Sequence, residues 1–240
     1  MARIEDGNLK GAVGNIVFYA MNGKTYARTK PGKRKKKRNA LESPQLSVFK
    51  MVTNHGTAML MQLKPLFLFP FKRDTYNLFR GWMMDQLNAR ESNAAWEVAV
   101  ADTLLYNLNR DADLRNLLLI LPEVSVTAKG KVSARFPSFI PANKIIAPIK
   151  TTEVNIKMIA VVAPFSGNQN SCTISTDNYP VQFDKQPAAE KEFVLNAGGS
   201  TGDMLFIIVG LEYVQSKTLG NSYLQNTKWL PAAIVAVGKL

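Results

Sequence analysis

The second half of this chain is a series of short apolar or alternating runs separated by turn residues, and this pattern restricts the fold more than any other feature. Pro, Gly, Asn and Asp lie between the runs. Short strands at such spacing are typical of an antiparallel sandwich or barrel. Alternation over residues 154–158 indicates a sheet with one face in water. The runs are 117–121, 124–128, 131–136, 152–163, 171–176, 191–195, 204–212 and 231–237.

A β-hairpin is predicted near the N-terminus. Asn22-Gly23 separates the runs 16–21 and 24–28, which are both rich in β-branched and aromatic residues. Asn-Gly supplies the two positive φ angles that a type I′ turn needs. Because a two-stranded ribbon is only marginally stable alone, this hairpin is expected to pack on the body of the protein or on another subunit.

Positive charge is concentrated at the same end of the chain. The 240 residues carry 30 Lys and Arg against 18 Asp and Glu, which gives a net charge of +12. Residues 1–43 hold eleven basic and three acidic groups, and therefore +8 of that excess. Six basic residues form an unbroken run, which like-charge repulsion keeps extended until an anion neutralises it. The run is Lys33, Arg34, Lys35, Lys36, Lys37 and Arg38.

Three interpretations of this basic run stay open: a phosphate-binding arm, a solvated linker, or a patch that docks on an acidic protein or lipid surface. No aromatic residue lies between Lys30 and Gln45, so binding by the arm would be directed at a nucleic-acid backbone and independent of sequence. The candidate residues for binding nucleic acid or another anionic partner are Lys24, Arg28, Lys30, Lys33, Arg34, Lys35, Lys36, Lys37 and Arg38.

Two or three helices are predicted between the basic run and the strands. Ser43-Pro44 is typical of a helix start, and the apolar spacing predicts a first helix over 44–63. A second helix is expected over 75–89, with a stripe of Met and aromatic residues that we interpret as core. Residues 92–108 indicate a third helix, although the two valines of that segment also fit a strand. The expected buried face of the first helix comprises Phe49, Val52, Gly56, Met59, Leu60 and Leu63.

Enzymatic chemistry is not expected, and no catalytic residue, metal site, cofactor or small-molecule substrate is inferred. One Cys and one His cannot supply the nitrogen and sulfur ligands of a metal site, and we interpret Cys172 and His55 as buried structural residues. The chain contains no phosphate-binding loop motif. Neighbouring acids are interpreted as solvated surface groups, namely Asp85 with Glu91 and Asp111 with Asp113.

The sequence contains no membrane or export signal. No window approaches about 18 consecutive apolar residues, which excludes a membrane-spanning helix. The N-terminus lacks the apolar stretch of a secretory signal. Together with the free Cys172, these observations predict a cytoplasmic or virion location.

Glycines at positions 7, 11 and 14, the predicted hairpin and the helix start Ser43-Pro44 together form an N-terminal pattern. In this pattern the N-terminal region resembles a family of small Bacteroidota proteins to which no activity is assigned. The resemblance covers about residues 7–55 and implies a layout of the fold, with nothing about mechanism. Family members usually carry an Arg shortly before an aromatic residue, where this chain has Ser47 or Val48 before Phe49. The opening also resembles that of some phage structural proteins. The shared features are the glycines Gly7, Gly11 and Gly14, a hairpin ending in Arg28, a link with Pro31, and the helix start Ser43-Pro44-Gln45-Leu46.

The sequence therefore predicts an α+β protein in three parts. An N-terminal β-hairpin and basic arm occupy 1–43, two to three helices occupy 44–112, and a C-terminal antiparallel β-sandwich occupies 113–240. The expected function is that of a non-enzymatic structural protein, of a virion or another repetitive assembly, whose basic arm contacts nucleic acid or an acidic partner. The alternative is a sequence-independent nucleic-acid-binding protein. The expected partners are other copies of the chain and nucleic acid, and not a membrane.

Overall fold

A computed structural model divides the chain into two compact units, Met1–Ser43 and Pro44–Leu240. We describe each unit by itself. The residues that the structure describes are 3–5, 7–21, 23–30, 32, 44–90, 97–98, 106–127, 131–164, 172–217 and 220–240.

The N-terminal unit is a four-stranded antiparallel sheet in which the strands follow their order in the chain. Met21 pairs with Lys24 across the turn, and Gly23 has a φ of 72°, which confirms the predicted hairpin. Two further turns contain Gly7 and Gly14, with φ values of 73° and 56°, and they add two strands to that hairpin. The strands are β1 (Arg3–Glu5), β2 (Asn8–Val13), β3 (Ile16–Met21) and β4 (Lys24–Thr29).

Two long helices begin the C-terminal unit. Helix α1 (Pro44–Leu63) has the predicted bounds, and α2 (Arg73–Arg90) follows the short 3-10 helix η1 (Lys64–Leu66). The predicted buried face of α1 is confirmed from Val52 to Leu63. Phe49, however, is 54% exposed, because Val48 packs against the core in its place.

The rest of the C-terminal unit consists mainly of two antiparallel sheets. The larger sheet has the strand order β10-β9-β12-β14-β5, with β13 also paired to β12 and β6 to β14. The smaller sheet has the order β11-β8-β7. The strands of the larger sheet are β5 (Glu97–Val98), β6 (Tyr106–Asn107), β9 (Thr151–Ala163), β10 (Thr173–Gln182), β12 (Met204–Lys217), β13 (Gly220–Tyr223) and β14 (Ala232–Lys239). Those of the smaller sheet are β7 (Glu123–Thr127), β8 (Lys131–Phe136) and β11 (Lys191–Asn196). The short helices are α3 (Leu114–Leu117), α4 (Pro141–Lys144) and η2 (Thr227–Trp229).

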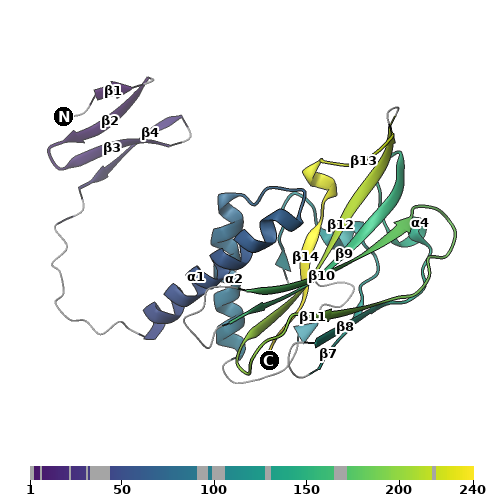
Figure 1. Cartoon of the computed structure of the whole chain (residues 1–240). Helices are drawn as coiled ribbons and strands as arrows, with labels where there is room; N and C mark the ends of the chain where they lie inside the picture. The colour runs from purple at the N-terminus through teal and green to yellow at the C-terminus, as the bar shows by residue number, and fades with distance from the viewer. Residues whose placement is uncertain are drawn as a thin grey trace. The chain divides into compact units, whose positions relative to one another are not determined.

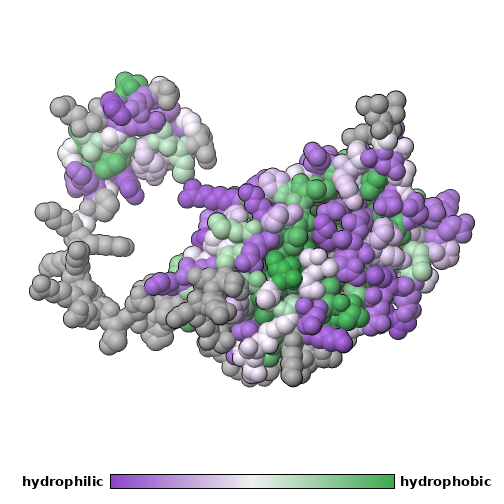
Figure 2. Space-filling view, viewed as in Figure 1, coloured by the Kyte–Doolittle hydropathy of each residue, from purple (hydrophilic) through white to green (hydrophobic). Residues whose placement is uncertain are grey.

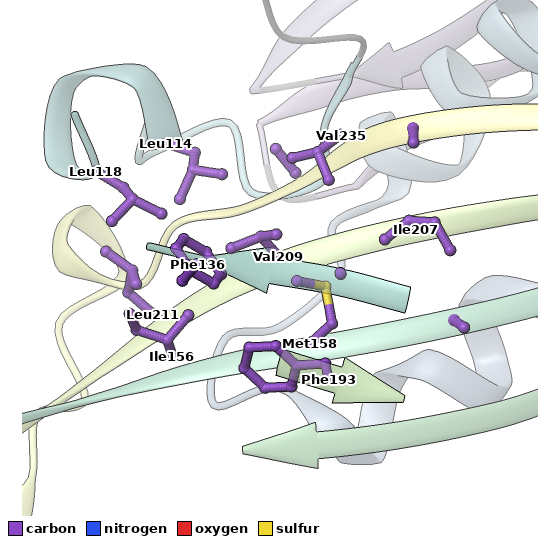
Figure 3. Close-up of a cluster of buried hydrophobic side chains, with 14 of the residues drawn as sticks. Leu114, Leu118, Phe136, Ile156, Met158, Phe193, Ile207, Val209, Leu211 and Val235 are labelled. Atoms are coloured by element: carbon purple, nitrogen blue, oxygen red, sulfur yellow. The ribbon is translucent and has the colours of Figure 1, made fainter. Parts of the chain in front are cut away.

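The larger sheet buries both of its faces. On β12, Phe206 and Ile208 pack against the core formed with α1 and α2, which lie over one face (Figure 1). Alternate residues of the same sheet, including Met158 and Ile207, pack toward the smaller sheet and its Phe193 (Figure 3). The helices and the strands therefore belong to one compact unit of three layers, with the larger sheet in the middle.

The expectation that residues 154–158 have one face in water is wrong. Asn155 is buried, and the side chain of Lys157 is only 16% exposed. The Lys157 ammonium lies 2.5 Å from a carboxylate oxygen of Glu212 and donates a hydrogen bond to the carbonyl of Leu66 at 2.6 Å. The Asn155 amide donates to the other Glu212 oxygen at 3.3 Å. The polar residues of this alternation thus form a buried network beneath η1.

Two predicted elements differ from the structure. In the described part of the segment 92–108, the expected third helix is absent, because β5 and β6 pair with β14 instead. The expected strand over 117–121 begins within the one-turn helix α3, and Leu118 forms only an isolated bridge with Ile145. Both segments take their conformation from contacts with distant parts of the chain, which local patterns do not contain.

Asp113 is the N-cap residue of α3. Its carboxylate accepts a hydrogen bond from the backbone N–H of Arg115 at 3.0 Å and forms an ion pair with the Arg115 guanidinium at 2.7 Å. The Arg115 side chain is the main cause of the lowered pKa of Asp113. Because the folded-state pKa lies below the unfolded value, the stabilisation is complete above the ordinary Asp pKa of 3.8 and is lost as the pH falls through the lowered value.

We expect Asp113→Ala to lower the free energy of unfolding by about 1 kcal/mol near neutral pH, the usual cost of losing a helix cap. In acid the difference from the wild type should shrink, because below the ordinary Asp pKa of 3.8 the unfolded wild type binds a proton and the stabilisation by the carboxylate decreases. Urea midpoints at about pH 7 and about pH 3 check this, with Asp85→Ala, an exposed acid of α2, as control. An equal difference at both pH values would contradict the assigned role.

Candidate interaction surface on the N-terminal sheet

The N-terminal sheet has no buried side chain among its described residues. Six of its large hydrophobic residues are between 38% and 75% exposed. Figure 2 shows hydrophobic residues at the surface of this unit. A sheet of this size cannot form a core of its own, so its apolar surface is available for contact with another molecule. The six are Ile4, Val13, Ile16, Tyr19, Met21 and Tyr26.

The strand register divides the sheet from β3 to β4 into two faces of different chemistry. Residues directly opposite each other in paired strands share a face, and neighbours along a strand alternate between faces. The tyrosine face consists of Val17, Tyr19, Met21, Lys24, Tyr26 and Arg28. The uncharged face consists of Ile16, Phe18, Ala20, Thr25, Ala27 and Thr29, and Val13 of β2 joins it opposite Ile16.

The tyrosine face combines flat rings with cations. Tyr19 and Tyr26 lie opposite each other, with ring centroids 5.7 Å apart and ring planes inclined by 23°. The guanidinium carbon of Arg28 lies 5.7 Å from the centroid of the Tyr19 ring, which is a cation–π contact. The three groups therefore form one stacked cluster on the tyrosine face.

Three predicted binding residues, Lys24, Arg28 and Lys30, lie on or just after β4. None of the three forms an ion pair with a carboxylate of the described residues, whereas Arg3 and Lys10 both pair with Glu5. The backbone N–H of Lys30 donates to the carbonyl of Asn15 at 2.6 Å, which fixes the end of β4 beside the β2–β3 turn. The other predicted residues, Lys33 to Arg38, lie outside the described residues.

Sequence reasoning missed the two tyrosines as part of this surface. It considered base stacking only by aromatic residues of the arm after Lys30. The signal was nevertheless present, because a two-residue Asn-Gly turn sets the hairpin register and so places Tyr19 opposite Tyr26. The structure thus adds aromatic groups to a site that the sequence predicted from charge alone.

Cys172, His55 and Asp111 of the C-terminal unit, which were considered for chemistry, are buried or form an ion pair within the fold. Cys172 is buried, and burial raises the pKa of its thiol to about 11, so the thiol stays protonated. His55 is also buried, and burial lowers its pKa. Asp111 forms an ion pair with Lys72 at 2.7 Å, and hydrogen bonding to Lys72 is the main cause of its lowered pKa. Glu91 lies outside the described residues.

Within the described part of the chain, no group of three or more His, Cys, Asp and Glu side chains is placed to hold a metal ion. No helix of the described residues is long and apolar enough to cross a membrane. No protein-family model, curated protein or solved structure matches the chain.

Proposed function

We propose that this chain is a non-enzymatic structural protein of a repetitive assembly, such as a virion. In this proposal the N-terminal sheet packs on a neighbouring copy, and the cations of the tyrosine face and the basic run contact nucleic acid or an acidic partner. The observation that carries the proposal is that the sheet buries no side chain while it exposes six large hydrophobic residues. The proposed location is accordingly the cytoplasm or a virion, and the proposed relatives are the Bacteroidota family with the same glycine and hairpin pattern.

The uncharged face is the surface that we assign to the contact between copies. Val13 and Ile16 lie directly opposite each other on it and are 58% and 43% exposed. Burying such side chains is favourable by roughly 1.5–3 kcal/mol each. The edge strand β4 carries Lys24 and Arg28, and charges on an edge oppose the addition of another strand. Packing by the face therefore suits this sheet better than pairing by the edge.

The C-terminal unit has a hydrophobic core of its own, and this supports the proposal. Among the residues that the structure describes, all members of its two hydrophobic core clusters lie in the chain after position 47. We propose that its two sheets form a β-sandwich, which is supported by the hydrophobic core that they share. A rigid body that carries a separate adhesive segment is a suitable subunit for an assembly.

The alternative function is a nucleic-acid-binding protein that does not read sequence. The observation that favours it is the set of cations on and after β4 that form no ion pair with the described carboxylates. Such a protein would bind phosphates and release counterions, so its affinity would fall steeply with salt. It would not need contacts between copies.

Deleting residues 1–43 and neutralising the basic run separate the two functions. Under the assembly function, the deletion is expected to reduce the assembled mass to that of the monomer, while replacing Lys33 to Arg38 by Gln leaves the mass unchanged at high salt. Under the alternative, the Gln variant loses nucleic-acid binding and the mass is unaffected by either change. Light scattering measures the assembled mass of each variant, and a DNA-binding assay measures its affinity for nucleic acid. The two measurements together distinguish the two functions. A truncated chain that keeps the mass of the intact protein would contradict the assembly function.

A further inference from the structure

We infer that the tyrosine face of the N-terminal sheet binds single-stranded nucleic acid by stacking bases on Tyr19 and Tyr26. The inference rests on the proposed function, because it names the chemical class of the anionic partner that the cationic N-terminal unit contacts. It adds two residues, Tyr19 and Tyr26, to a site that was assigned only cations.

The geometry of the two tyrosines fits a stacking platform. Both residues are more than a third exposed, at 39% and 38%, and they lie opposite each other on adjacent strands of the sheet. The two rings are stacked on each other with an interplanar angle of 23°, so a base can stack on a ring face that is turned away from the partner ring. Every nucleobase has such a flat π surface, and stacking on it tolerates any sequence.

The cations around the rings fit a phosphate backbone. Lys24 and Arg28 lie on the same face as Tyr26, two residues to either side of it. The Arg28 guanidinium lies over the Tyr19 ring, 5.7 Å from its centroid, so it can meet a phosphate next to a base that stacks on the tyrosines. A strand of nucleic acid can therefore stack its bases on the rings while its phosphates meet Lys24, Arg28 and Lys30.

The same geometry distinguishes a single strand from other anions. In a duplex, both surfaces of each base are already covered by neighbouring bases, so the tyrosines have no surface to bind. An acidic peptide would use the cations alone and would be indifferent to the rings. Dependence of the affinity on the rings is therefore the property that identifies a single strand as the ligand.

The test measures binding of fluorescein-labelled oligothymidine, about ten nucleotides long, to the full chain by fluorescence anisotropy. We expect the double change Tyr19→Leu with Tyr26→Leu to weaken binding by about tenfold or more. The double change to Phe keeps both rings and should stay within about twofold of the wild type. Tyr223→Leu, which removes a similarly exposed tyrosine of β13, is the matched control and should also have little effect. A duplex of the same length should bind more weakly than the single strand.

A photochemical measurement on the unchanged protein covers the case in which the Leu variant fails to fold. An oligonucleotide that contains 5-iodouracil cross-links to stacked aromatic side chains under ultraviolet light, and mass spectrometry should locate adducts on Tyr19 or Tyr26. Adducts only at other residues, unchanged affinity of a folded Leu variant, or equal affinity for duplex and single strand would each overturn the inference. Failure of the assembly function would appear instead in the mass of the protein, which this assay does not measure.

Discussion

Placing lysines on the uncharged face is expected to dissociate the assembly. Val13→Lys with Ile16→Lys puts two ammonium groups where the contact between copies would bury two apolar side chains. Losing that burial on both sides of a contact should weaken the association by about 100-fold or more. Because Val13 and Ile16 are exposed within their own unit, the change leaves its internal packing largely intact. Mass by light scattering over a concentration series measures the effect.

Met21→Lys is the matched control for this experiment. Met21 lies on β3 like Ile16 and is similarly exposed, at 53%, but it belongs to the tyrosine face. The control adds one charge to the strand that carries Ile16, but on the other face of the sheet, so it should leave the mass unchanged. Equal dissociation by the control would show that net charge, and not the uncharged face, governs the association.

The second large effect concerns the buried pair of Lys157 and Glu212. We expect Glu212→Gln to lower the free energy of unfolding by about 3–5 kcal/mol, because it leaves the Lys157 ammonium in a largely water-free site without its counter-charge. The side chains are only 16% and 11% exposed, and the hydrogen bond to the carbonyl of Leu66 cannot replace a full negative charge. Chemical denaturation of the variant and the wild type measures the loss.

Glu190→Gln is a suitable comparison for Glu212→Gln. It breaks the Arg135–Glu190 pair, whose atoms are 2.6 Å apart but whose side chains are about half exposed, at 53% and 48%. Solvent screens exposed pairs, so they contribute little to stability and this variant should be nearly as stable as the wild type. Replacing both buried partners by apolar residues, as in Lys157→Met with Glu212→Leu, should recover much of the stability. Similar losses for Glu212→Gln and Glu190→Gln would contradict the buried role of the pair.

The sequence predicted elements whose signals are local. Ser43-Pro44 marked the start of α1, and the Asn22-Gly23 turn marked the hairpin. The run 131–136 coincides with β8, because apolar and polar residues alternate across its two faces. In each case the residues that decide the structure lie within a few positions of one another.

The errors arose where distant residues decide the structure. The segments β5 and β6 have two residues each, too few to show a period, and they become strands by pairing with β14 more than a hundred positions later. Lys157 contributed to an alternation that is typical of a sheet with one face in water. Its side chain lies inside the protein instead, where the Glu212 carboxylate neutralises its charge. A local pattern cannot contain a partner 55 residues away.

The candidate site was predicted in part. Charge alone identified Lys24, Arg28 and Lys30, because an excess of basic residues is visible in composition. The division of the sheet into a tyrosine face and an uncharged face depends on the strand register. The Asn-Gly turn determines this register, but the sequence analysis did not use it to pair opposing residues such as Tyr19 and Tyr26. Those two faces are the surfaces to which we assign the proposed contacts, one with another copy and one with an anion.

Light scattering behind size exclusion, on the intact chain at about 0.15 M and about 1 M salt, tests most directly whether copies associate through apolar contacts. The Debye length falls from roughly 8 Å to 3 Å between these conditions, so contacts held by charge alone weaken. Contacts between uncharged faces do not weaken in this way as the salt concentration rises. We predict a defined mass of more than one chain that persists at high salt. A monomer at both salt concentrations would contradict the assembly function.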